Sequence, residues 1–476
     1  MFNRRQFLAT SGAAASLALG TSWATAQRTS PNEQIGLAVI GLGGRGSGLM
    51  NVFRRFSDVR IVALAEPDQE RLAKAGKSVP DAVQTQDMMD IIDRPDVDAV
   101  VIATSNHWHC LAAIRACKAG KDVYVEKPLG HNLYEQEQLV KAARKYDRMV
   151  QMGTQQRSSP IQARAKQVLH QDKLIGDLQH VVVSRIGERK PIGKRSEPLQ
   201  VASTVDYDQW IGPAPDQPIY RNNLQYDWHW DWNTGNGEMG NWGVHVLDDA
   251  LNVAMLDKAG FPSAVQSAGM RAEWDDAGNT PNTQVAYFEN SVLPMSMLLS
   301  NIVPADPLVE GAHNDGFGTG YTVFGEGGRL CGSRGHWRVF DNDGKLIEEL
   351  KGPEGMGRHQ RDFLDAVRTR DQSKLTAEVE RGHISTAWCQ LASIAALEGE
   401  ASSSGLQSDA AGRWSDLVEG YQEQIKNVSP NVTATPPGRV EVDSKTGAVK
   451  QLTSENAQQL VHRTYRTSEW AAEFEV

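Results

Sequence analysis

Short apolar runs alternate with helix-like segments over the first third of the chain. Helical patterns cover residues 110–118 and 135–146. The apolar runs have the length of buried strands and lie at residues 35–40, 60–65, 97–103, 122–125 and 149–152. Strands that alternate with helices are typical of a parallel sheet with helical crossovers. The pattern therefore predicts an α/β domain, a doubly wound parallel sheet of the Rossmann type, over residues 27–155.

The rhythm changes after about residue 155. One helix is expected at residues 161–170 and another at 358–368. The strand-like runs become longer, have fewer helices between them, and lie at residues 178–185, 264–274, 284–288, 295–303 and 321–325. Long strands with few crossovers predict an open, largely antiparallel sheet. We expect residues 156–400 to form a second, α+β domain.

A C-terminal extension follows the second domain at residues 401–476. Its first part, residues 401–438, is rich in Ser, Gly and Pro. Because these residues favour connecting segments, we expect a surface loop there.

The N-terminus is expected to be a targeting segment rather than part of the fold. Arg4 and Arg5 precede a mildly apolar, Ala-rich run that ends in the small residues 24–26. This arrangement resembles a twin-arginine export signal over residues 1–26. The signal predicts the twin-arginine export machinery as a partner and a periplasmic location. That pathway carries proteins that are already folded. A plain N-terminal helix is the alternative, but no amphipathic period runs through the segment.

Composition narrows the class of protein. The 476 residues are 40% hydrophobic and 23% charged, as in ordinary globular proteins. The formal net charge of −10 argues against a nucleic-acid partner, and no later run is long enough to predict a membrane span. We expect four buried, unpaired thiols, at Cys110, Cys117, Cys331 and Cys389.

A glycine-rich motif, Gly41-Leu42-Gly43-Gly44-Arg45-Gly46, follows the first strand and opens a helix. In this context Gly41 permits a tight turn, Gly43 lets the backbone approach a pyrophosphate, and Gly46 lets helix and strand pack closely. The N–H groups at the helix start can hold the anion. We therefore expect a dinucleotide here, bound by Gly41, Gly43, Gly44, Arg45 and Gly46.

An acidic residue stands where the ribose of such a cofactor would bind. Glu66 ends the second strand, 20 residues after Gly46. A carboxylate at this position can bind the ribose diol and repels a 2′-phosphate, which favours NAD over NADP. NADP stays open because Arg45 could reach a phosphate.

Three polar segments follow predicted strands or open a helix, where α/β sheets bind ligands. They are ATSNHWH at residues 103–109, VEKPL at 125–129 and GNGEMGNWGVHVLD at 235–248. Lys127 suits a cation held beside a reacting oxygen, and His245 suits a proton acceptor near neutral pH. A surface lysine and a satisfied core histidine stay open as alternatives. The paired histidines of the first segment lack a third ligand at sensible spacing, so we expect no metal site.

Together these motifs resemble the Gfo/Idh/MocA family, the glucose–fructose oxidoreductase and inositol dehydrogenase group. The likeness runs from about residue 35 to 398 and rests on GLGGRG, ATSNHWH, VEKPLG, GTQQR and GNWGVH in combination. It implies an N-terminal Rossmann domain and a C-terminal α/β domain whose open sheet often mediates homo-oligomers. It also implies that Lys127 and His245 are catalytic, and that the nicotinamide side is lined by Asn106, His109 and Glu126. Thr104 and Lys127 are expected to bind the cofactor as well.

One position departs from the family pattern. Four residues before the histidine the family usually has Asp, and this chain has Asn241. A neutral amide cannot relay a proton, although it can orient a ring or bind a substrate hydroxyl.

An aromatic cluster at residues 226–232 precedes the histidine motif. Its alternating pattern fits a strand with one buried face, and it also fits a platform on which sugar rings stack. We favour the platform because of its position beside the motif, with Trp210 as a further member. The expected substrate residues are Gln155, Tyr226, Trp228, Trp230, Asn241 and Trp242.

These observations favour an exported, NAD-dependent oxidoreductase that acts on a CH–OH group of a sugar, sugar acid or glycoside with a tightly held cofactor. One alternative is a redox-neutral glycoside-cleaving enzyme, which oxidises a hydroxyl, eliminates the aglycone, adds water and reduces again. It needs an extra base, for which Tyr226, Asp227 and His229 are candidates. A second alternative is a sugar- or nucleotide-binding protein without catalysis.

Overall fold

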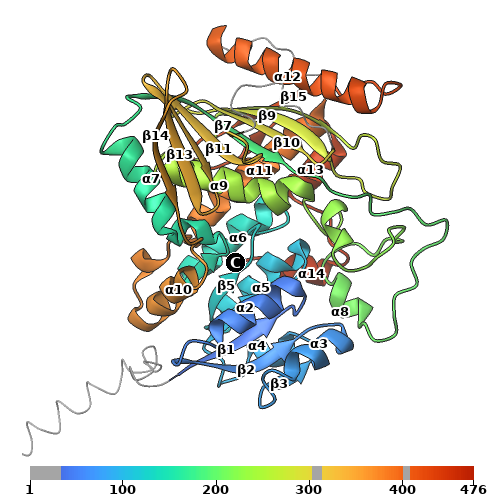
Figure 1. Cartoon of the computed structure of the whole chain (residues 1–476). Coiled ribbons are helices and arrows are strands. Elements are labelled where there is room, and N and C mark those ends of the chain that lie inside the picture. The colour runs from blue at the N-terminus through green and yellow to red at the C-terminus, as the bar shows by residue number, and fades with distance from the viewer. Residues whose placement is uncertain (1–33, 303–313, 400–407) are drawn as a thin grey trace, which may run out of the picture.

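The structure is a computed structural model that describes residues 34–302, 314–399 and 408–476. The signal expected at residues 1–26 lies outside these residues. Two sheets form the body of the molecule, and they occupy the lower and upper parts of Figure 1.

The N-terminal sheet has six parallel strands in the order β3-β2-β1-β4-β5-β6. The strands are β1 (Ile35–Ile40), β2 (Val59–Ala65), β3 (Val83–Thr85), β4 (Ala99–Ile102), β5 (Asp122–Val125) and β6 (Val150–Met152). The helices between them are α2 (Gly44–Phe53), α3 (Gln69–Gly76), α4 (Met89–Ile92), α5 (Asn106–Lys118) and α6 (Leu133–Lys145). The predicted doubly wound sheet is confirmed. The edge strand β3 was missed because its residues are largely exposed and form no apolar run.

The second sheet has ten strands in the order β14-β13-β12-β11-β7-β10-β9-β8-β15-β16. Its strands are β7 (Leu178–Ile186), β8 (Ala264–Met270), β9 (Thr283–Glu289), β10 (Met295–Ser300), β11 (Thr319–Gly325), β12 (Gly328–Ser333), β13 (His336–Asp341), β14 (Leu346–Lys351), β15 (Gly438–Val442) and β16 (Val449–Lys450). Among the described strands of this sheet, β7 and β10 are the one pair that runs in parallel. The expectation of a largely antiparallel sheet is confirmed, and the C-terminal extension adds two strands to it.

Helices cover both faces of this large sheet (Figure 1). The inner face carries α7 (Pro160–His170), α9 (Val244–Val253) and α11 (Val379–Glu398), which share one apolar core with the strands. The outer face carries α12 (Ser408–Val428). The surface loop expected at residues 401–438 is therefore wrong over α12. Four apolar side chains at helical spacing form the stripe that packs on the sheet, namely Trp414, Leu417, Tyr421 and Ile425.

Later parts of the chain return to the N-terminal domain. In α10 (Arg358–Thr369), the Phe363 ring lies 6.3 Å from Phe53 and 5.8 Å from Tyr124. In α14 (Ser468–Glu473), Trp470 meets Trp108 edge-on at 5.4 Å. The two domains thus share packing contacts that a linear division of the sequence does not anticipate.

The remaining elements are short. They are α8 (Tyr207–Ile211), α13 (Glu455–Val461), 3₁₀ turns at Gln155–Ser158, Asp227–Trp230 and Gln372–Lys374, and a π-helical turn at Met239–Gly243. The turn at Asp227–Trp230 means that the aromatic cluster is not a strand. A 3₁₀ turn keeps neighbouring side chains on different faces, so the cluster is split between the interior and the surface.

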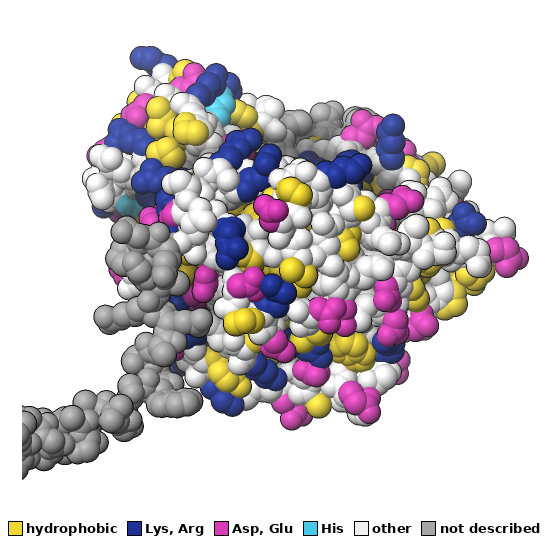
Figure 2. All heavy atoms as spheres, turned by 90° about the horizontal axis from the view of Figure 1, so that it is seen from below, with side chains coloured by type: hydrophobic (Ala, Val, Ile, Leu, Met, Phe, Trp, Pro, Cys, Tyr) yellow, Lys and Arg dark blue, Asp and Glu magenta, His cyan; other side chains and the backbone are white. Residues whose placement is uncertain are grey.

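Three general features of the core and the surface complete the fold. All four cysteines are buried and free, as predicted. Among the described residues, no helix combines the length and apolar character that a membrane crossing requires. Acidic and basic side chains are interspersed on the face shown in Figure 2.

Candidate active site

A cavity of about 650 Å³ lies between the two domains, at the carboxyl ends of the parallel strands. Its walls include the residues that end β1, β2, β4 and β5, together with the segments around Tyr226 and His245 from the second domain. Open α/β sheets bind ligands at this edge, so the topology places the cavity where a cofactor is expected.

The glycine-rich motif forms one wall of the cavity. Gly41 has a φ of +83°, and a Cβ there would lie 2.7 Å from the carbonyl of Ala103. A Cβ on Gly46 would overlap the carbonyl oxygen of Gly41, so Gly46 serves helix packing and does not line the cavity. Gly43 and Gly44 line it at the start of α2, where free N–H groups can bind a pyrophosphate. The wall fits a dinucleotide.

Glu66 lies at the end of β2, where the ribose acid is expected. Its buried carboxylate accepts hydrogen bonds from the backbone N–H of Leu42 at 2.6 Å and of Asp68 at 3.3 Å. Burial raises the pKa of this carboxyl above its usual value. The same end of the cavity contains Arg71 of α3, which sequence reasoning missed.

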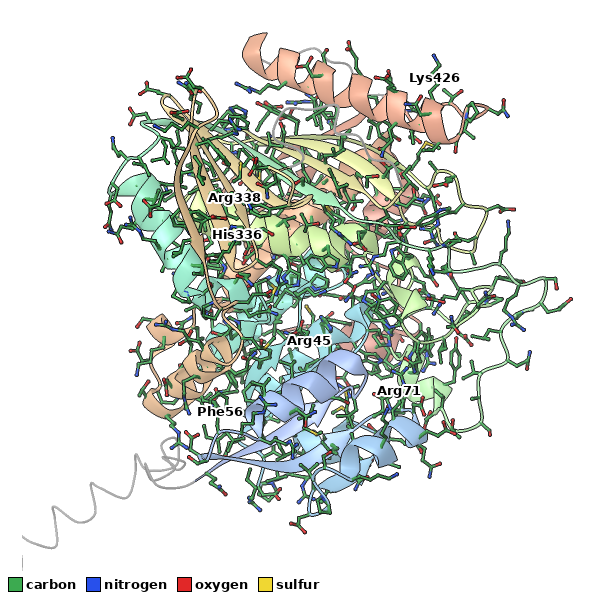
Figure 3. The ribbon with its side chains drawn as sticks, viewed as in Figure 1. Arg45, Phe56, Arg71, His336, Arg338 and Lys426 are labelled. Carbon is green, nitrogen blue, oxygen red and sulfur yellow. The ribbon has the colours of Figure 1, made fainter. Side chains whose placement is uncertain are left out.

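Arg45 does not lie beside Glu66. Its Nε donates to Glu126 Oε1 at 2.6 Å. Glu126 directly follows β5, and β1 and β4 lie between β5 and β2. The idea that Arg45 reaches a 2′-phosphate is therefore wrong, because the guanidinium is held at the opposite end of the cavity. Figure 3 shows Arg45 at the start of α2 and Arg71 on α3.

The segments after β4 and β5 line the middle of the cavity. Thr104, Asn106, His109, Glu126 and Lys127 all contribute to its surface. Both ring nitrogens of His109 lie within hydrogen-bond distance of backbone carbonyl oxygens. This ring is fixed by the backbone, so its part is to shape the wall.

Lys127 is held at the centre of this surface. Its Nζ donates to the backbone oxygen of Asn241 at 2.8 Å and to Asn241 Oδ1 at 3.2 Å. Burial lowers the pKa of the ammonium to about 8. Asn241 therefore contacts the lysine, and within the described residues it makes no hydrogen bond to the His245 ring.

His245 enters the cavity from the first turn of α9. Within the described residues its ring makes no hydrogen bond, and its one ring contact is edge-on with Trp242 at 5.7 Å. Burial, reinforced by the positive charges of Arg334 and Lys127, lowers the pKa of the imidazole well below its usual value. The ring is thus neutral near pH 7 and can accept a proton.

The aromatic cluster contributes only part of the expected platform. Tyr226, Trp228 and His229 line the cavity, and the rings of Trp228 and His229 stack at 3.6 Å. Trp230 does not line it, because the 3₁₀ turn directs this ring inward, beneath the guanidinium of Arg189 at 5.5 Å. Asp227 also lies outside the wall and accepts from Asn223.

Trp242 lines the cavity but its ring is not free for stacking. The guanidinium of Arg185 lies 4.9 Å from the ring centroid and that of Arg334 lies 5.5 Å away. Gln155 lies nearby, where its amide oxygen accepts from Nη2 of both Arg45 and Arg334 at 3.2 Å.

Two charged residues of the substrate half were missed. Arg334 follows β12, Glu354 precedes α10, and Arg334 Nε donates to Glu354 Oε2 at 2.9 Å. They lie about 90 residues or more beyond the histidine motif and belong to no recognisable pattern. Only the pairing of β12 with β13 and the packing of α10 on the first domain bring them to the cavity.

Comparison with protein families agrees with this geometry. Residues 35–154 match the profile GFO_IDH_MocA, described as "Oxidoreductase family, NAD-binding Rossmann fold". Residues 168–292 match GFO_IDH_MocA_C2, described as "Oxidoreductase family, C-terminal alpha/beta domain". The two segments together span just over half of the chain.

Similar curated proteins include two groups. The chain is 33% identical over 184 residues to an inositol 2-dehydrogenase of Gluconacetobacter diazotrophicus, covering 37% of this chain and 54% of that protein. It is 32% identical over 168 residues to glycosyl hydrolase family 109 protein 2 of a Shewanella species, covering 30% and 37%. The matched parts therefore span only about a third to a half of these relatives.

Solved structures share the fold at low sequence identity. The aldose-aldose oxidoreductase of Caulobacter crescentus has a TM-score of 0.57 at 18% identity, over 77% of this chain and 99% of that one. The WlbA dehydrogenase of Bordetella pertussis, in complex with NADH and UDP-GlcNAcA, has a TM-score of 0.57 at 16% identity, over 76% and 97%.

Proposed function

The chain belongs to the Gfo/Idh/MocA oxidoreductase family, and from that premise we propose that it moves hydride between NAD and a hydroxyl-bearing carbon of a carbohydrate. The observation that carries the proposal is a convergence. Lys127 from the first domain and His245 from the second line one cavity, directly beside the glycine-rich wall that fits a dinucleotide.

Each of the two residues has a part that its surroundings support. NAD, when bound, supplies the hydride acceptor at its nicotinamide ring. His245 takes the proton of the substrate hydroxyl, since the ring is neutral and makes no hydrogen bond in the described protein. Lys127, which is half-buried in the cavity wall, stabilises the alkoxide that develops, because a positive charge held where negative charge forms lowers the energy of the transition state.

A loop of the second domain supports a tightly held cofactor. Residues 204–211, here called the latch, lie across the turn that follows Glu66. The backbone N–H of Gln69 donates to Thr204 at 2.9 Å, and that of Asp206 donates to Pro67 at 2.9 Å. Within the latch, Gln209 and Trp210 line the cavity. The latch thus joins the two domains beside the proposed ribose site and opposes release of the cofactor.

The C-terminal extension holds the latch from its other side. Arg466 donates through its backbone N–H to Pro213 at 3.0 Å and through Nη1 to Asp208 at 2.7 Å. Trp108 donates through Nε1 to the backbone oxygen of Trp210 at 3.0 Å, and Trp470 packs edge-on against Trp108.

A cofactor that stays bound suits an exported enzyme, since free nicotinamide nucleotides are cytoplasmic metabolites. On this basis we propose twin-arginine export to the periplasm. We also propose that the protein acts as a homo-oligomer.

Redox-neutral glycoside cleavage is the second candidate, favoured by the likeness to glycosyl hydrolase family 109 proteins. Of the three extra bases considered, Tyr226 and His229 line the cavity and Asp227 does not. Glu354 is a further acid in the wall. The two reactions differ in product: an oxidoreductase accumulates an oxidised sugar, whereas the second reaction releases the aglycone without net oxidation.

The test begins with protein purified after folding in the cytoplasm. It is denatured, and any released nucleotide is identified by mass. Near-stoichiometric NAD(H) is the expected result, and the protein is then assayed with paired sugars and with glycosides. A protein that carries no nucleotide and binds no added NAD would contradict the proposal and leave a binding protein without catalysis.

A further inference from the structure

The π-helical turn at Met239–Gly243 brings Asn241 into the cavity, and Glu238 stands directly before it. Turns of this kind are frequent at functional sites. In the part of the chain that the structure describes, Glu238 does not line the cavity, and its side chain is fully buried. Burying a charge is costly unless the charge is paired, so the contacts of this carboxylate show what it does beside the cavity.

Three side chains surround the Glu238 carboxylate. Arg185 Nε donates to Oε1 at 2.8 Å, and Arg189 Nη2 donates to the same oxygen at 3.2 Å. The other oxygen, Oε2, accepts from Asn241 Nδ2 at 3.1 Å. One oxygen therefore serves the two arginines and the other is aimed at the amide beside Lys127.

This contact fixes which way the Asn241 amide faces. An ionised carboxylate only accepts hydrogen bonds, so the NH₂ group must point to Glu238. The amide oxygen then points the opposite way, where it accepts from Lys127 Nζ at 3.2 Å. The ammonium is also held by the backbone oxygen of Asn241 at 2.8 Å. Were the amide reversed, an NH₂ group would face the ammonium and the lysine would lose an acceptor.

Glu238 also acts on Lys127 through its charge. Burial lowers the pKa of Lys127, and the negative charge of Glu238 opposes that shift, as does Glu126. Arg45 and Arg334 act in the other direction. Glu238 is thus one of two acids that help to keep the lysine protonated within a surrounding that is otherwise rich in positive charge.

We propose that Glu238 is the positioning residue for the catalytic Lys127, and that it acts through the Asn241 amide. It orients the acceptor that holds the ammonium at the cavity wall, and it supplies negative charge one layer behind the lysine. The inference rests on the proposed role of Lys127. Glu238 itself touches neither the substrate nor the reacting atoms.

Two variants test the proposal. In Glu238→Gln the neighbouring amide can face either way and one negative charge is lost. We expect kcat/KM to fall about tenfold, since a hydrogen bond to a charged group is broken, and the alkaline limb of the rate profile to move to lower pH. In the double variant Glu238→Gln/Asn241→Asp a carboxylate returns beside Lys127, so activity and the alkaline limb should recover towards wild type.

Asp276→Asn is the matched control. Asp276 is also a fully buried acid paired with an arginine, Arg271, but it does not line the cavity. We expect this variant to change stability without moving the alkaline limb. If Glu238→Gln leaves the limb in place, or if the double variant is no more active than the single one, Glu238 is merely structural and the proposal is wrong.

A readout that does not depend on activity separates this inference from the proposed function. Lys127 lines the cavity, so its acetylation by acetic anhydride can be followed across pH by peptide mass spectrometry on the intact protein. We expect a lower apparent pKa of Lys127 in Glu238→Gln, and a return in the double variant, even if no carbohydrate is oxidised. An unchanged Lys127 titration in folded Glu238→Gln overturns the inference. A shifted titration without hydride transfer instead overturns only the proposed function.

Discussion

Removing the Trp470 side chain should loosen the cofactor through Trp108, a residue of the cavity wall that Trp470 packs against from outside the cavity. Trp470 does not line the cavity, but its ring meets Trp108 edge-on at 5.4 Å and lies 5.4 Å from the guanidinium of Arg115. An edge-to-face pair contributes about 0.5–1.5 kcal/mol and an exposed cation–π contact about 0.5–1 kcal/mol. Trp108 in turn holds the latch through its hydrogen bond to Trp210.

The expected effect of Trp470→Ala follows from these magnitudes. If the lost contacts of about 1–2.5 kcal/mol act on the closed latch, NAD(H) release accelerates about 5- to 60-fold, at 1.4 kcal/mol per factor of ten. The assay loads the protein with NADH, adds excess NAD, and follows the fluorescence of the bound reduced nicotinamide as it is displaced.

Trp414→Ala is the matched control, because Trp414 is a buried tryptophan of α12 on the outer face of the large sheet. This variant should lower the free energy of unfolding and leave NADH release unchanged. The reasoning fails if folded Trp470→Ala releases NADH at the wild-type rate, or if both variants accelerate release equally.

Three further predictions concern the cavity itself. Lys127→Ala should lower kcat about 100-fold or more while NAD stays bound, since the loss of one group that stabilises an oxyanion has this effect; single-turnover kinetics and nucleotide content measure the two quantities. As pH falls below 6.5, the rate of carbohydrate oxidation should stay level, because His245 remains neutral until its lowered pKa is reached. The rate should fall as pH rises through about 8, where Lys127 loses its proton. A profile of kcat/KM against pH checks both sides. Glu66→Ala should weaken NAD binding about tenfold and reduce the preference for NAD over NADP. The carboxylate that accepts from the ribose and repels a 2′-phosphate is removed. Titration of the nucleotide-free protein with each cofactor measures both affinities.

The first domain could be predicted from the sequence because local signals decide it. The strand that precedes Gly41, the glycine spacing and Glu66 at the next strand end all occur within one βαβ unit. These three features bind a dinucleotide through the backbone geometry of a strand, a tight turn and a helix start, and few other arrangements combine them. The GNWGVH motif could likewise be placed at a helix start, and the structure puts His245 on the first turn of α9.

The rest of the cavity depends on contacts that no local pattern reports. Arg334 and Glu354 come from strand connections and reach the wall only through pairing in the large sheet. Trp230 was predicted to face substrate because the aromatic cluster lies beside the histidine motif, but the 3₁₀ turn directs its side chain inward. The helix α12 was missed because Ser and Gly dominate the composition of the extension and hide an apolar stripe with helical spacing.

The contact between Asn241 and Lys127 was also beyond sequence reasoning. The substitution of an amide for a carboxylate was visible, and it raised a question about the histidine. Only the π-helical turn shows that this side chain lies between Lys127 and Glu238.

Hydride transfer itself is the most direct test of the account. The NAD-loaded protein is mixed with carbohydrates that carry deuterium on their hydroxyl-bearing carbons. The nucleotide is then released and its mass is measured by mass spectrometry. The account predicts reduced nicotinamide that has gained one deuterium with at least one sugar, and a gain that is about 100-fold slower or more in Lys127→Ala. A wild-type protein that holds NAD and gains no deuterium from any sugar, sugar acid or glycoside would contradict it.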